Sequence, residues 1–312
     1  MSLRLALFGQ APLAIACLER LQKAGHIISV VYTPEDGSRT DALASYARSL
    51  GLDVIQCKYF QHKDGSPIPD IVNTYQRYEV DLNVLASFTS FLPSVISDSP
   101  QHKSICYHPS LLPKYRGGNA LQWQIINGEI ETGVSIFVPD SGIDTGPIVI
   151  QKGGVQIASS DTVGSLFFDK LAPLGVEAII EAVSAIDEGT ASIKDQNESL
   201  ASFQKLVDKN DAMIDLSMSA TDIDRLIRGC DPQPGAHLPY AGKLLKLYDT
   251  SLLSPSDQVP GTIISMNDSS IVIALNNSSL RIGKVRFDNG KEPAKKFAER
   301  HSLNVGSTLI SK

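Results

Sequence analysis

The chain has 312 residues, of which 42% are hydrophobic and 20% are charged. This composition supplies enough apolar material for a sizeable core and excludes a disordered chain, while the length favours about two domains. Twenty-eight Lys and Arg against 34 Asp and Glu leave a net charge of −6, so no overall positive field attracts nucleic acid or an anionic membrane.

The four cysteines, Cys17, Cys57, Cys106 and Cys230, are scattered and form no CxxC pair. Such spacing is typical neither of a disulfide scaffold nor of a clustered metal site, so we expect a reducing, cytoplasmic location and no bound metal. No apolar run approaches the roughly 18 uninterrupted residues of a transmembrane helix, and polar residues interrupt the N-terminal apolar run. We therefore expect neither a membrane span nor a signal peptide.

The first part of the chain alternates short apolar runs with segments of helical spacing. Strands are expected at residues 3–8, 27–33, 53–55, 81–86, 104–107 and 132–139. Helices are expected at residues 12–23, 41–50, 68–78, 120–127 and 162–187. Asp161 or Thr162 is suited to cap the last helix. The alternation predicts an α/β domain with a doubly wound, mostly parallel sheet.

The pattern changes near residue 190. Residues 191–204 are polar and predict a linker between a first domain at 1–190 and a second at 205–312. After a short helix at 223–228, β-rich runs separated by turn residues continue from residue 244 onward. We therefore predict a smaller C-terminal β-barrel-like domain, in which the basic stretch 291–301 forms an exposed helix.

Several common nucleotide-binding and catalytic motifs are missing from the chain. The first predicted strand–helix turn, at residues 9–12, has one glycine where a dinucleotide fingerprint has three. No phosphate loop, HExxH or GxSxG motif occurs. The sequence therefore predicts no nicotinamide cofactor.

The segment 104–146 holds the residues best suited to catalysis. His108 and Asp144 each follow a predicted strand, and ligands of open α/β sheets bind beyond the carboxyl ends of strands. A carboxylate beside an imidazole orients the ring and favours its charged form. Such a pair is suited to proton transfer.

Each of these residues also has a structural alternative. His108 could be a buried histidine bonded to the backbone, which is the commoner fate of a single histidine. Asp140 and Asp144 could instead bond the N–H groups of the turns around Gly142 and Gly146. The residues alone leave both interpretations open.

Two motifs together make the chain resemble a known family. HPSLLPKYRG is followed, one predicted helix and strand later, by DSGIDTG. This pair is similar to the signature of the 10-formyltetrahydrofolate-dependent formyltransferase family, which includes methionyl-tRNA formyltransferases, amino-sugar formyltransferases and the hydrolase domain of 10-formyltetrahydrofolate dehydrogenase. Residues 82–93 resemble its folate-pocket segment and residues 227–249 the entry to its C-terminal β domain, so nearly the whole chain is covered. The resemblance implies a Rossmann-like formyltransferase fold.

The resemblance also implies roles for individual residues. His108 and Asp144 match the catalytic His and Asp of the family. Cys106 stands where most transferases have an Asn that helps to hold the formyl oxygen, and a thiol lacks that amide N–H donor. The hydrolase domain of the dehydrogenase resembles this chain more closely, with an apolar residue there. We therefore expect transfer of the formyl group of 10-formyltetrahydrofolate to water, giving tetrahydrofolate and formate.

Other residues take their expected roles from the same resemblance. Those expected to bind the folate are Ser87, Phe88, Phe91, Leu92, Asp140 and Asp144. Those expected to shape the site are Pro113, Arg116, Gly117, Gly142 and Gly146. Without the resemblance, Phe88 and Phe91 would be interpreted as core aromatics at the exit of a strand.

Other chemistries at the same positions are weaker alternatives. Cys106 could act as a nucleophile because it lies two residues from His108, on the same face of the strand. A zinc site formed by Cys106, His108 and Asp144 lacks clustered ligand spacing. Ser110 lacks the glycines of a nucleophile elbow.

The formyl acceptor and the partners are less well defined. Residues 33–43, where tRNA formyltransferases typically carry a basic insertion, contain Glu35, Asp36 and Asp41 against Arg39 alone, which makes a poor phosphate-binding segment. A tRNA acceptor is therefore disfavoured but remains the alternative, beside an amino-sugar nucleotide and a non-catalytic formylfolate-binding module. The sequence does not indicate the oligomeric state.

Overall fold

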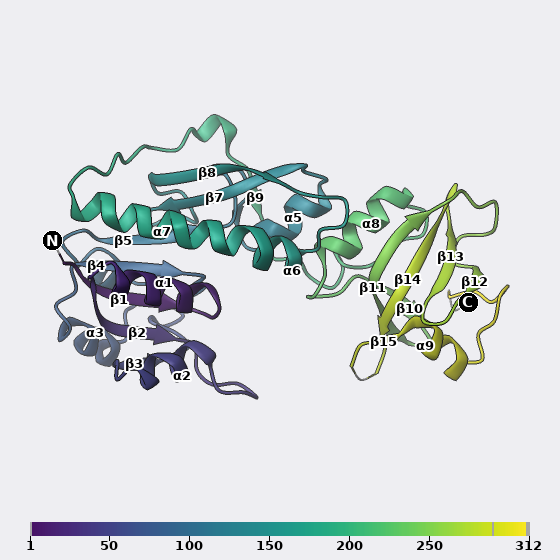
Figure 1. Cartoon of the computed structure of the whole chain (residues 1–312), viewed down its shortest axis with the longest axis horizontal. Helices are drawn as coiled ribbons and strands as arrows, with labels where there is room; N and C mark the ends of the chain where they lie inside the picture. The colour runs from purple at the N-terminus through teal and green to yellow at the C-terminus, as the bar shows by residue number, and fades with distance from the viewer. Residues whose placement is uncertain (1, 289, 310–312) are drawn as a thin grey trace. The chain divides into compact units, whose positions relative to one another are not determined.

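The computed structural model describes residues 2–288 and 290–309 and divides the chain into two compact units (Figure 1). The first unit consists of residues 1–117, 132–155 and 168–203, and the second of residues 118–131, 156–167 and 204–312. Two inner segments, 118–131 and 156–167, thus group with the C-terminal part of the chain. The expected division was contiguous, with a first domain at 1–190, a linker at 191–204 and a second domain at 205–312.

The first unit is built on a seven-stranded sheet in the order β3-β2-β1-β4-β5-β7-β8. Its strands are β1 (Arg4–Gly9), β2 (Ile27–Thr33), β3 (Val54–Gln56), β4 (Leu82–Ala86), β5 (Ser104–His108), β7 (Glu131–Phe137) and β8 (Ile148–Gln156). Strands β1 to β5 pair in parallel, whereas β7 is antiparallel to β5. The predicted mostly parallel α/β sheet is confirmed.

Helices cover both faces of this sheet. They are α1 (Leu13–Lys23), α2 (Ala42–Ser49), α3 (Pro69–Gln76), α4 (Ser94–Ser97) and α7 (Ala172–Asp187). On one face α7 contacts α1, and Gly175 of α7 lies so close to the ring of Tyr107 that a side chain there would collide with it. On the other face, α3 and α4 supply Tyr75 and Ile96 to a hydrophobic core. The sheet is therefore doubly wound, as predicted.

That second face carries a group of aromatic side chains, called the aromatic cluster below. Its members are Phe8, Tyr32, Phe60 and Tyr75, all buried. The rings of Phe8 and Tyr32 stack with their centroids 4.5 Å apart. The cluster lies beneath the segment that leaves β4, because Phe88 of that segment packs edge-on against Phe8.

The strand order reverses between β1 and β4. The chain runs from β1 outward to β2 and β3, and then returns to the other side of β1 to form β4 and β5. Because these five strands are parallel, the residues that follow β1, β4 and β5 emerge at one edge of the sheet. Ligands of open α/β sheets bind at such a reversal.

Two details of the region from β8 to α7 were not predicted. Strand β8 was missed because its sequence, IVIQKGGVQ, contains two glycines and several exposed positions that hide the strand pattern. The long helix at 162–187 consists of a turn at Val163–Ser165 (α6), a π-helical segment at Leu166–Leu171 and α7. Pro173 at the start of α7 lacks the backbone N–H that would continue a regular α-helix. Thr162 caps α6 with its side chain, as expected.

Two further short strands form a small sheet of their own. Strands β6 (Arg116–Gly117) and β9 (Phe203–Gln204) pair with each other, and a single 3₁₀ turn spans Glu198–Leu200. None of the helices in residues 2–288 and 290–309 is long and apolar enough to cross a membrane.

The second unit contains an antiparallel sheet in the order β10-β11-β14-β13-β12, with β15 paired to β14. The strands are β10 (His237–Tyr240), β11 (Lys243–Leu253), β12 (Ile263–Met266), β13 (Ile271–Leu275), β14 (Ser278–Arg286) and β15 (Glu292–Pro293). Its helices are α5 (Ala120–Ile126), α8 (Ala220–Gly229) and α9 (Ala294–Arg300). The expected smaller β-rich domain is confirmed.

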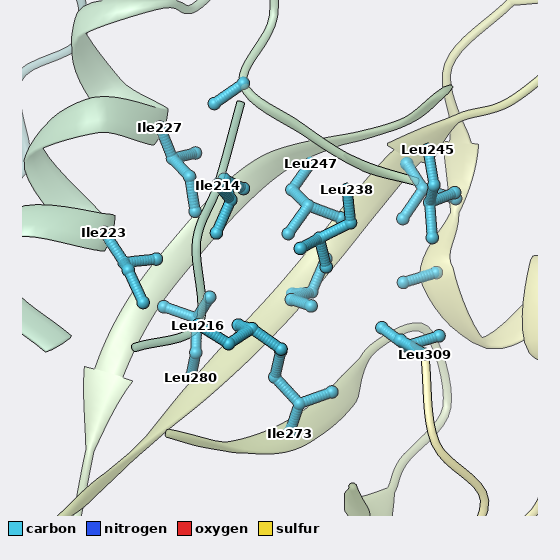
Figure 2. Packing of buried hydrophobic residues seen from close by; sticks show 14 of the residues in the cluster. Ile214, Leu216, Ile223, Ile227, Leu238, Leu245, Leu247, Ile273, Leu280 and Leu309 are labelled. Carbon is cyan, nitrogen blue, oxygen red and sulfur yellow. The ribbon is translucent and has the colours of Figure 1, made fainter. Parts of the chain in front are cut away.

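The core of the second unit is almost entirely aliphatic. Figure 2 shows branched side chains of α8 and of the sheet, among them Ile223, Ile227, Ile273 and Leu280, meeting without a polar group among the sticks. Burial of such side chains is the main stabilising contribution in a domain of this size.

Two helices of the second unit add detail to this picture. The basic stretch 291–301, expected to form an exposed helix, is only partly exposed, because α9 buries Phe297 and Ala298 in the core. Helix α5 carries Trp123, whose indole N–H donates to the carbonyl of Lys205 at 2.7 Å.

Candidate active site

His108, the last residue of β5, lies in the carboxyl edge of the parallel sheet with 6% of its surface exposed. Its Nε2 lies 2.8 Å from the carbonyl oxygen of Tyr115. A carbonyl only accepts hydrogen bonds, so Nε2 carries the hydrogen and donates it. In a neutral imidazole, Nδ1 is then the ring nitrogen that presents a lone pair.

Hydrogen bonds within the loop after β5 bring the carbonyl of Tyr115 next to His108. The hydroxyl of Ser135 donates to the carbonyl of Ser110 at 2.7 Å and accepts from the N–H of Leu112 at 3.1 Å. The hydroxyl of Ser110 donates to the carbonyl of Lys114 at 2.7 Å. These internal hydrogen bonds satisfy the loop's polar groups and fix the partner of the imidazole.

Asp144 lies on the other side of the imidazole. Its Oδ2 is 3.5 Å from His108 Nδ1 and accepts a hydrogen bond from the N–H of Gly117 at 2.7 Å. Asp144 has a φ of 54°, a left-handed conformation that is uncommon outside glycine. The structure therefore brings together the two residues that the sequence predicted as a pair.

The electrostatics of the pair are dominated by burial. Burial lowers the pKa of the His108 imidazole below its ordinary value of 6.5, while the Asp144 charge and the hydrogen bond to Tyr115 act in the opposite direction. The imidazole is accordingly neutral at neutral pH. Nδ1 and the Asp144 carboxylate are then two proton acceptors facing each other, an arrangement that can take a proton from a bound molecule.

Cys106 lies two residues before His108 on β5 and packs against the hydrophobic core that contains the aromatic cluster. Its Sγ lies 3.7 Å from the carbonyl of Tyr107. Burial raises the pKa of the thiol far above its usual range, so the nucleophilic thiolate is not formed at neutral pH. Nothing in this environment favours the alternative of a nucleophilic cysteine.

The predicted zinc alternative has no support either. Within residues 2–288 and 290–309, no group of three or more His, Cys, Asp and Glu side chains is arranged to hold a metal ion. The pair at Asp144 and His108 therefore stands without a third metal-ligating side chain in the described part of the chain.

The segment predicted to bind folate follows β4 at the same edge of the sheet. Ser87 turns the chain with a φ of 60°. Phe88 packs edge-on against two rings of the aromatic cluster, with centroid distances of 5.5 and 5.6 Å, and Leu92 is partly buried on the same core. Phe91, in contrast, is 63% exposed. Phe88 and Leu92 thus anchor the segment on the hydrophobic core, whereas the side chain of Phe91 is exposed to solvent.

Asp140 and the glycines of DSGIDTG shape the loop that carries Asp144. The exposed Asp140 accepts hydrogen bonds from the N–H of Gly142 at 3.0 Å and from the hydroxyl of Thr145 at 2.6 Å. A side chain at Gly146 would collide with the carbonyl of Val138. These contacts are those of a tight turn, which was the structural alternative for Asp140.

Arg116 is almost fully buried, with 2% of its surface exposed. Its guanidinium forms two hydrogen bonds with the carboxylate of Glu198, at 2.9 and 2.6 Å, and two with Oε1 of Gln196, at 3.0 and 2.8 Å. The Glu198 carboxylate raises the pKa of Arg116, and Arg116 lowers the pKa of Glu198. A buried guanidinium paired in this way is a fixed structural element.

The partners of Arg116 lie in residues 191–204, the expected linker. Gln196, Glu198 and Ser202 all bond to the loop after β5, and the N–H of Ser202 donates to the carbonyl of Pro113 at 3.1 Å. Sequence reasoning missed Gln196 and Glu198 because a polar stretch has no periodic pattern. The one available signal for Glu198 was that a buried Arg requires an acidic partner.

Comparison with protein families accounts for most of the chain. The model described as formyl transferase matches residues 3–183, and the model described as formyl transferase, C-terminal domain, matches residues 206–302. The fold agrees with this result. The HypX protein from Aquifex aeolicus in complex with tetrahydrofolic acid superposes with a TM-score of 0.74 at 18% identity, covering 98% of this chain and 48% of HypX.

Curated relatives are more similar in sequence. The mitochondrial 10-formyltetrahydrofolate dehydrogenase of Mus musculus is 33% identical over 99% of this chain, but this chain spans only 34% of the length of that enzyme. The methionyl-tRNA formyltransferase of Nitrosospira multiformis is 31% identical over 97% of both chains. The resemblance carried by HPSLLPKYRG and DSGIDTG is confirmed, and the protein belongs to the formyl transferase family.

Proposed function

We propose that the chain binds 10-formyltetrahydrofolate and transfers its formyl group to water, releasing tetrahydrofolate and formate. The observation that carries the proposal is the pairing of the buried His108 with the partly buried Asp144 at the carboxyl edge of the sheet. Family membership supports the formylfolate donor. Cys106 in place of the amide donor of most transferases, together with 33% identity to a 10-formyltetrahydrofolate dehydrogenase, supports water as the acceptor.

The proposed reaction begins with a water molecule next to the pair. Water attacks the formyl carbon bonded to N10, and the proton that it loses is taken up by the two facing acceptors, His108 Nδ1 and the Asp144 carboxylate. The imidazolium formed in this way is stabilised by the Asp144 charge and by the carbonyl of Tyr115. Proton uptake at a buried ring is thus compensated on both of its sides.

The tetrahedral centre then breaks down. The C–N10 bond breaks, N10 takes the proton held by the pair, and the formyl carbon leaves as formate, so that one water is consumed and one proton is released. While the tetrahedral oxygen is negative, Nδ1–H of the imidazolium is the donor that this site can offer it. A thiol at Cys106 adds no amide donor, which predicts slower chemistry than in a site with Asn.

The folate is expected to lie along the segment that follows β4 and beside the loop that carries Asp144. Phe88 and Leu92 provide an apolar floor, which suits a flat heteroaromatic ring. The exposed ring of Phe91 is available to close over the ligand. In this proposal two further groups of residues have a structural role. The loop that carries Asp144 is shaped by Asp140, Gly142 and Gly146. The segment after β5 that holds the Asp144 carboxylate contains Pro113, Arg116 and Gly117.

A methionyl-tRNA acceptor is the second candidate. It is favoured by the methionyl-tRNA formyltransferase that matches this chain over 97% of both lengths. The second unit also carries an open groove of about 670 Å³ whose lining includes Lys243, Lys246 and Arg286, side chains of the kind that bind phosphates, together with Asp288, which forms an ion pair with Lys243.

The test is incubation of the purified protein with 10-formyltetrahydrofolate, with formate and tetrahydrofolate measured in the absence of an acceptor. Release that is abolished in the His108→Asn variant is expected. Turnover only after initiator methionyl-tRNA is added would replace the hydrolase by the second candidate. If the protein binds the folate but shows no turnover, even when tRNA or an amino-sugar nucleotide is added, the result would favour a non-catalytic formylfolate-binding module.

A further inference from the structure

Gln196 uses every hydrogen-bonding group of its side-chain amide on the active-site loop and its support. Its Nε2 donates to the carbonyl of Asp144 at 2.8 Å and to the carbonyl of Gly146 at 2.7 Å. Its Oε1 accepts from Nε and Nη2 of Arg116 at 3.0 and 2.8 Å. A primary amide has two donor hydrogens and two acceptor lone pairs, so this side chain is fully satisfied.

Arg116 fixes which way the amide points. A guanidinium has only donors, so the atom of Gln196 that faces it must be the oxygen, and the NH₂ group must face the two carbonyls. Arg116 is in turn held by the fork of bonds to Glu198 and by its own backbone N–H, which donates to the carbonyl of Ser202 at 2.9 Å. The orientation of Gln196 is therefore determined by a buried charge.

The residue that Gln196 holds is the one that needs support. Asp144 has left-handed backbone dihedrals, which a non-glycine residue keeps only where its surroundings impose them. Gln196 binds its carbonyl, and Gly117, the neighbour of Arg116, binds its carboxylate. Arg116 and Gly117 thus act on the two ends of Asp144, one through Gln196 and the other directly.

We infer that Gln196, oriented by Arg116, is a positioning residue that sets the distance between the Asp144 carboxylate and His108. It contacts no reacting atom and acts through the backbone of Asp144. The expected effect of Gln196 on catalysis rests on the proposed function. Its effect on the His108–Asp144 pair can be measured without a substrate.

The test compares two Gln→Met variants, because Met has a similar length and removes the hydrogen bonds. Gln56 is a matched control in the same unit: its amide accepts from Arg48 at 2.8 Å and donates to the carbonyl of Pro34 at 3.0 Å and to Asp36 at 2.8 Å. Both glutamines are partly buried. Only Gln196→Met is expected to act on the active site.

The first readout is the titration of His108 by NMR, with its signal assigned among the six histidines by its loss in His108→Asn. The Asp144 charge raises the pKa of His108, so a displaced carboxylate must let that pKa fall in Gln196→Met. Gln56→Met is expected to titrate like the wild type. An unchanged or higher His108 pKa in a folded Gln196→Met protein would overturn the inference, whatever its activity.

The second readout is turnover of 10-formyltetrahydrofolate. In Gln196→Met, kcat is expected to fall by about 10- to 100-fold, the range expected when a catalytic group is misplaced by about 1 Å, while KM stays within about threefold. Equal losses in Gln196→Met and Gln56→Met would mean a purely structural role and would overturn the inference.

A third variant guards against misfolding. Gln196→Leu also removes the hydrogen bonds to the carbonyls of Asp144 and Gly146 and adds no charge near His108, so the same fall in the His108 pKa is expected in this second, independent variant. If the wild type itself proves inactive with every acceptor, the proposed function fails, and the NMR titration still decides the role of Gln196.

Discussion

The two units of the chain solve different physical problems, and the carboxyl edge of the first sheet contrasts sharply with the core of the second. At that edge, polar groups satisfy one another, as in the chain of hydrogen bonds from the exposed Glu198 through the buried Arg116 and the partly buried Gln196 to Asp144. In the second unit, branched aliphatic side chains fill the core (Figure 2). Hydrogen bonds are directional, so they fix the positions of the groups at the edge. Hydrophobic contacts are not directional, and their burial in the core stabilises the folded second unit.

Left-handed backbone residues of two kinds occur in the chain, and neither kind accounts for all such residues of one unit. In the first unit, Ser87, Tyr115 and Asp144 have φ values of 60°, 59° and 54° and stand in the loops that follow strands at the candidate site. In the second unit, Ala241 and Asn277, with φ values of 47° and 52°, connect neighbouring strands. Left-handed residues of the second kind serve chain reversal, whereas those of the first kind aim groups at one place.

The largest effect is expected from Asp144→Asn, which keeps the shape of the side chain and removes its charge. An amide cannot take up the proton that a carboxylate accepts, so kcat should fall by about 10²- to 10⁴-fold. Formate release under saturating 10-formyltetrahydrofolate measures this change, with the exposed Asp64, bonded to Ser66, as the matched Asp→Asn control. Retention of more than about a tenth of the activity would remove Asp144 from the proposed mechanism.

The second expected effect lies in the other unit. Leu280 of β14 is fully buried, so Leu280→Ala should lower the free energy of unfolding by about 2–5 kcal/mol through lost burial and a cavity. Leu253 of β11, 46% exposed, gives a Leu→Ala control that should cost less than about 1 kcal/mol. Denaturant unfolding provides both values. An equal loss in the two variants would contradict the difference between core and surface.

The two variants also separate the units by activity. Leu280→Ala is expected to leave kcat unchanged at temperatures where the protein remains folded, because Leu280 belongs to the core of the second unit. A fall in kcat at low temperature, measured under the same conditions as the wild type, would mean that the second unit takes a direct part in the chemistry of the first.

The smallest expected effect concerns pH. Burial lowers the pKa of His108 below 6.5, so the imidazole is neutral at pH 7 and becomes protonated only as the pH falls further. Protonation removes the acceptor at Nδ1, and kcat/KM should therefore decrease by about tenfold for each pH unit below that pKa. A pH profile between 5 and 8 in a constant-ionic-strength buffer measures it; a rate that increases on acidification would show that the imidazolium is the working form in the free enzyme.

Much of the fold was predictable because it depends on local patterns. The parallel strands are buried on both faces and appear in the sequence as continuous apolar runs, such as Leu82–Ala86. The cap at Thr162 was identifiable from one side chain. Strand β8 was missed because its glycines and exposed residues resemble a turn. Grouping of α5 with the second unit depends on contacts distant in sequence, which local patterns do not report.

The candidate site was predictable only in part. His108 and Asp144 were identified through motifs, and the distance of 3.5 Å between Nδ1 and Oδ2 agrees with the expected pairing. The carbonyl of Tyr115 and the amide of Gln196 were not identifiable, because any residue has a backbone carbonyl and a glutamine in a polar stretch resembles a solvated one. Their roles depend on how the loops fold back, and the roles of all these residues in catalysis stay predictions.

The position of Trp123 has a practical consequence for the study of this protein. It is the single tryptophan of the chain, it lies on a helix of the second unit, and it packs at the edge of that unit's aliphatic core. Fluorescence excited selectively at the indole therefore reports on the second unit alone, with no substitution needed. Unfolding followed by this emission and unfolding followed by far-ultraviolet circular dichroism, which samples both units, would coincide only if the two units unfold together.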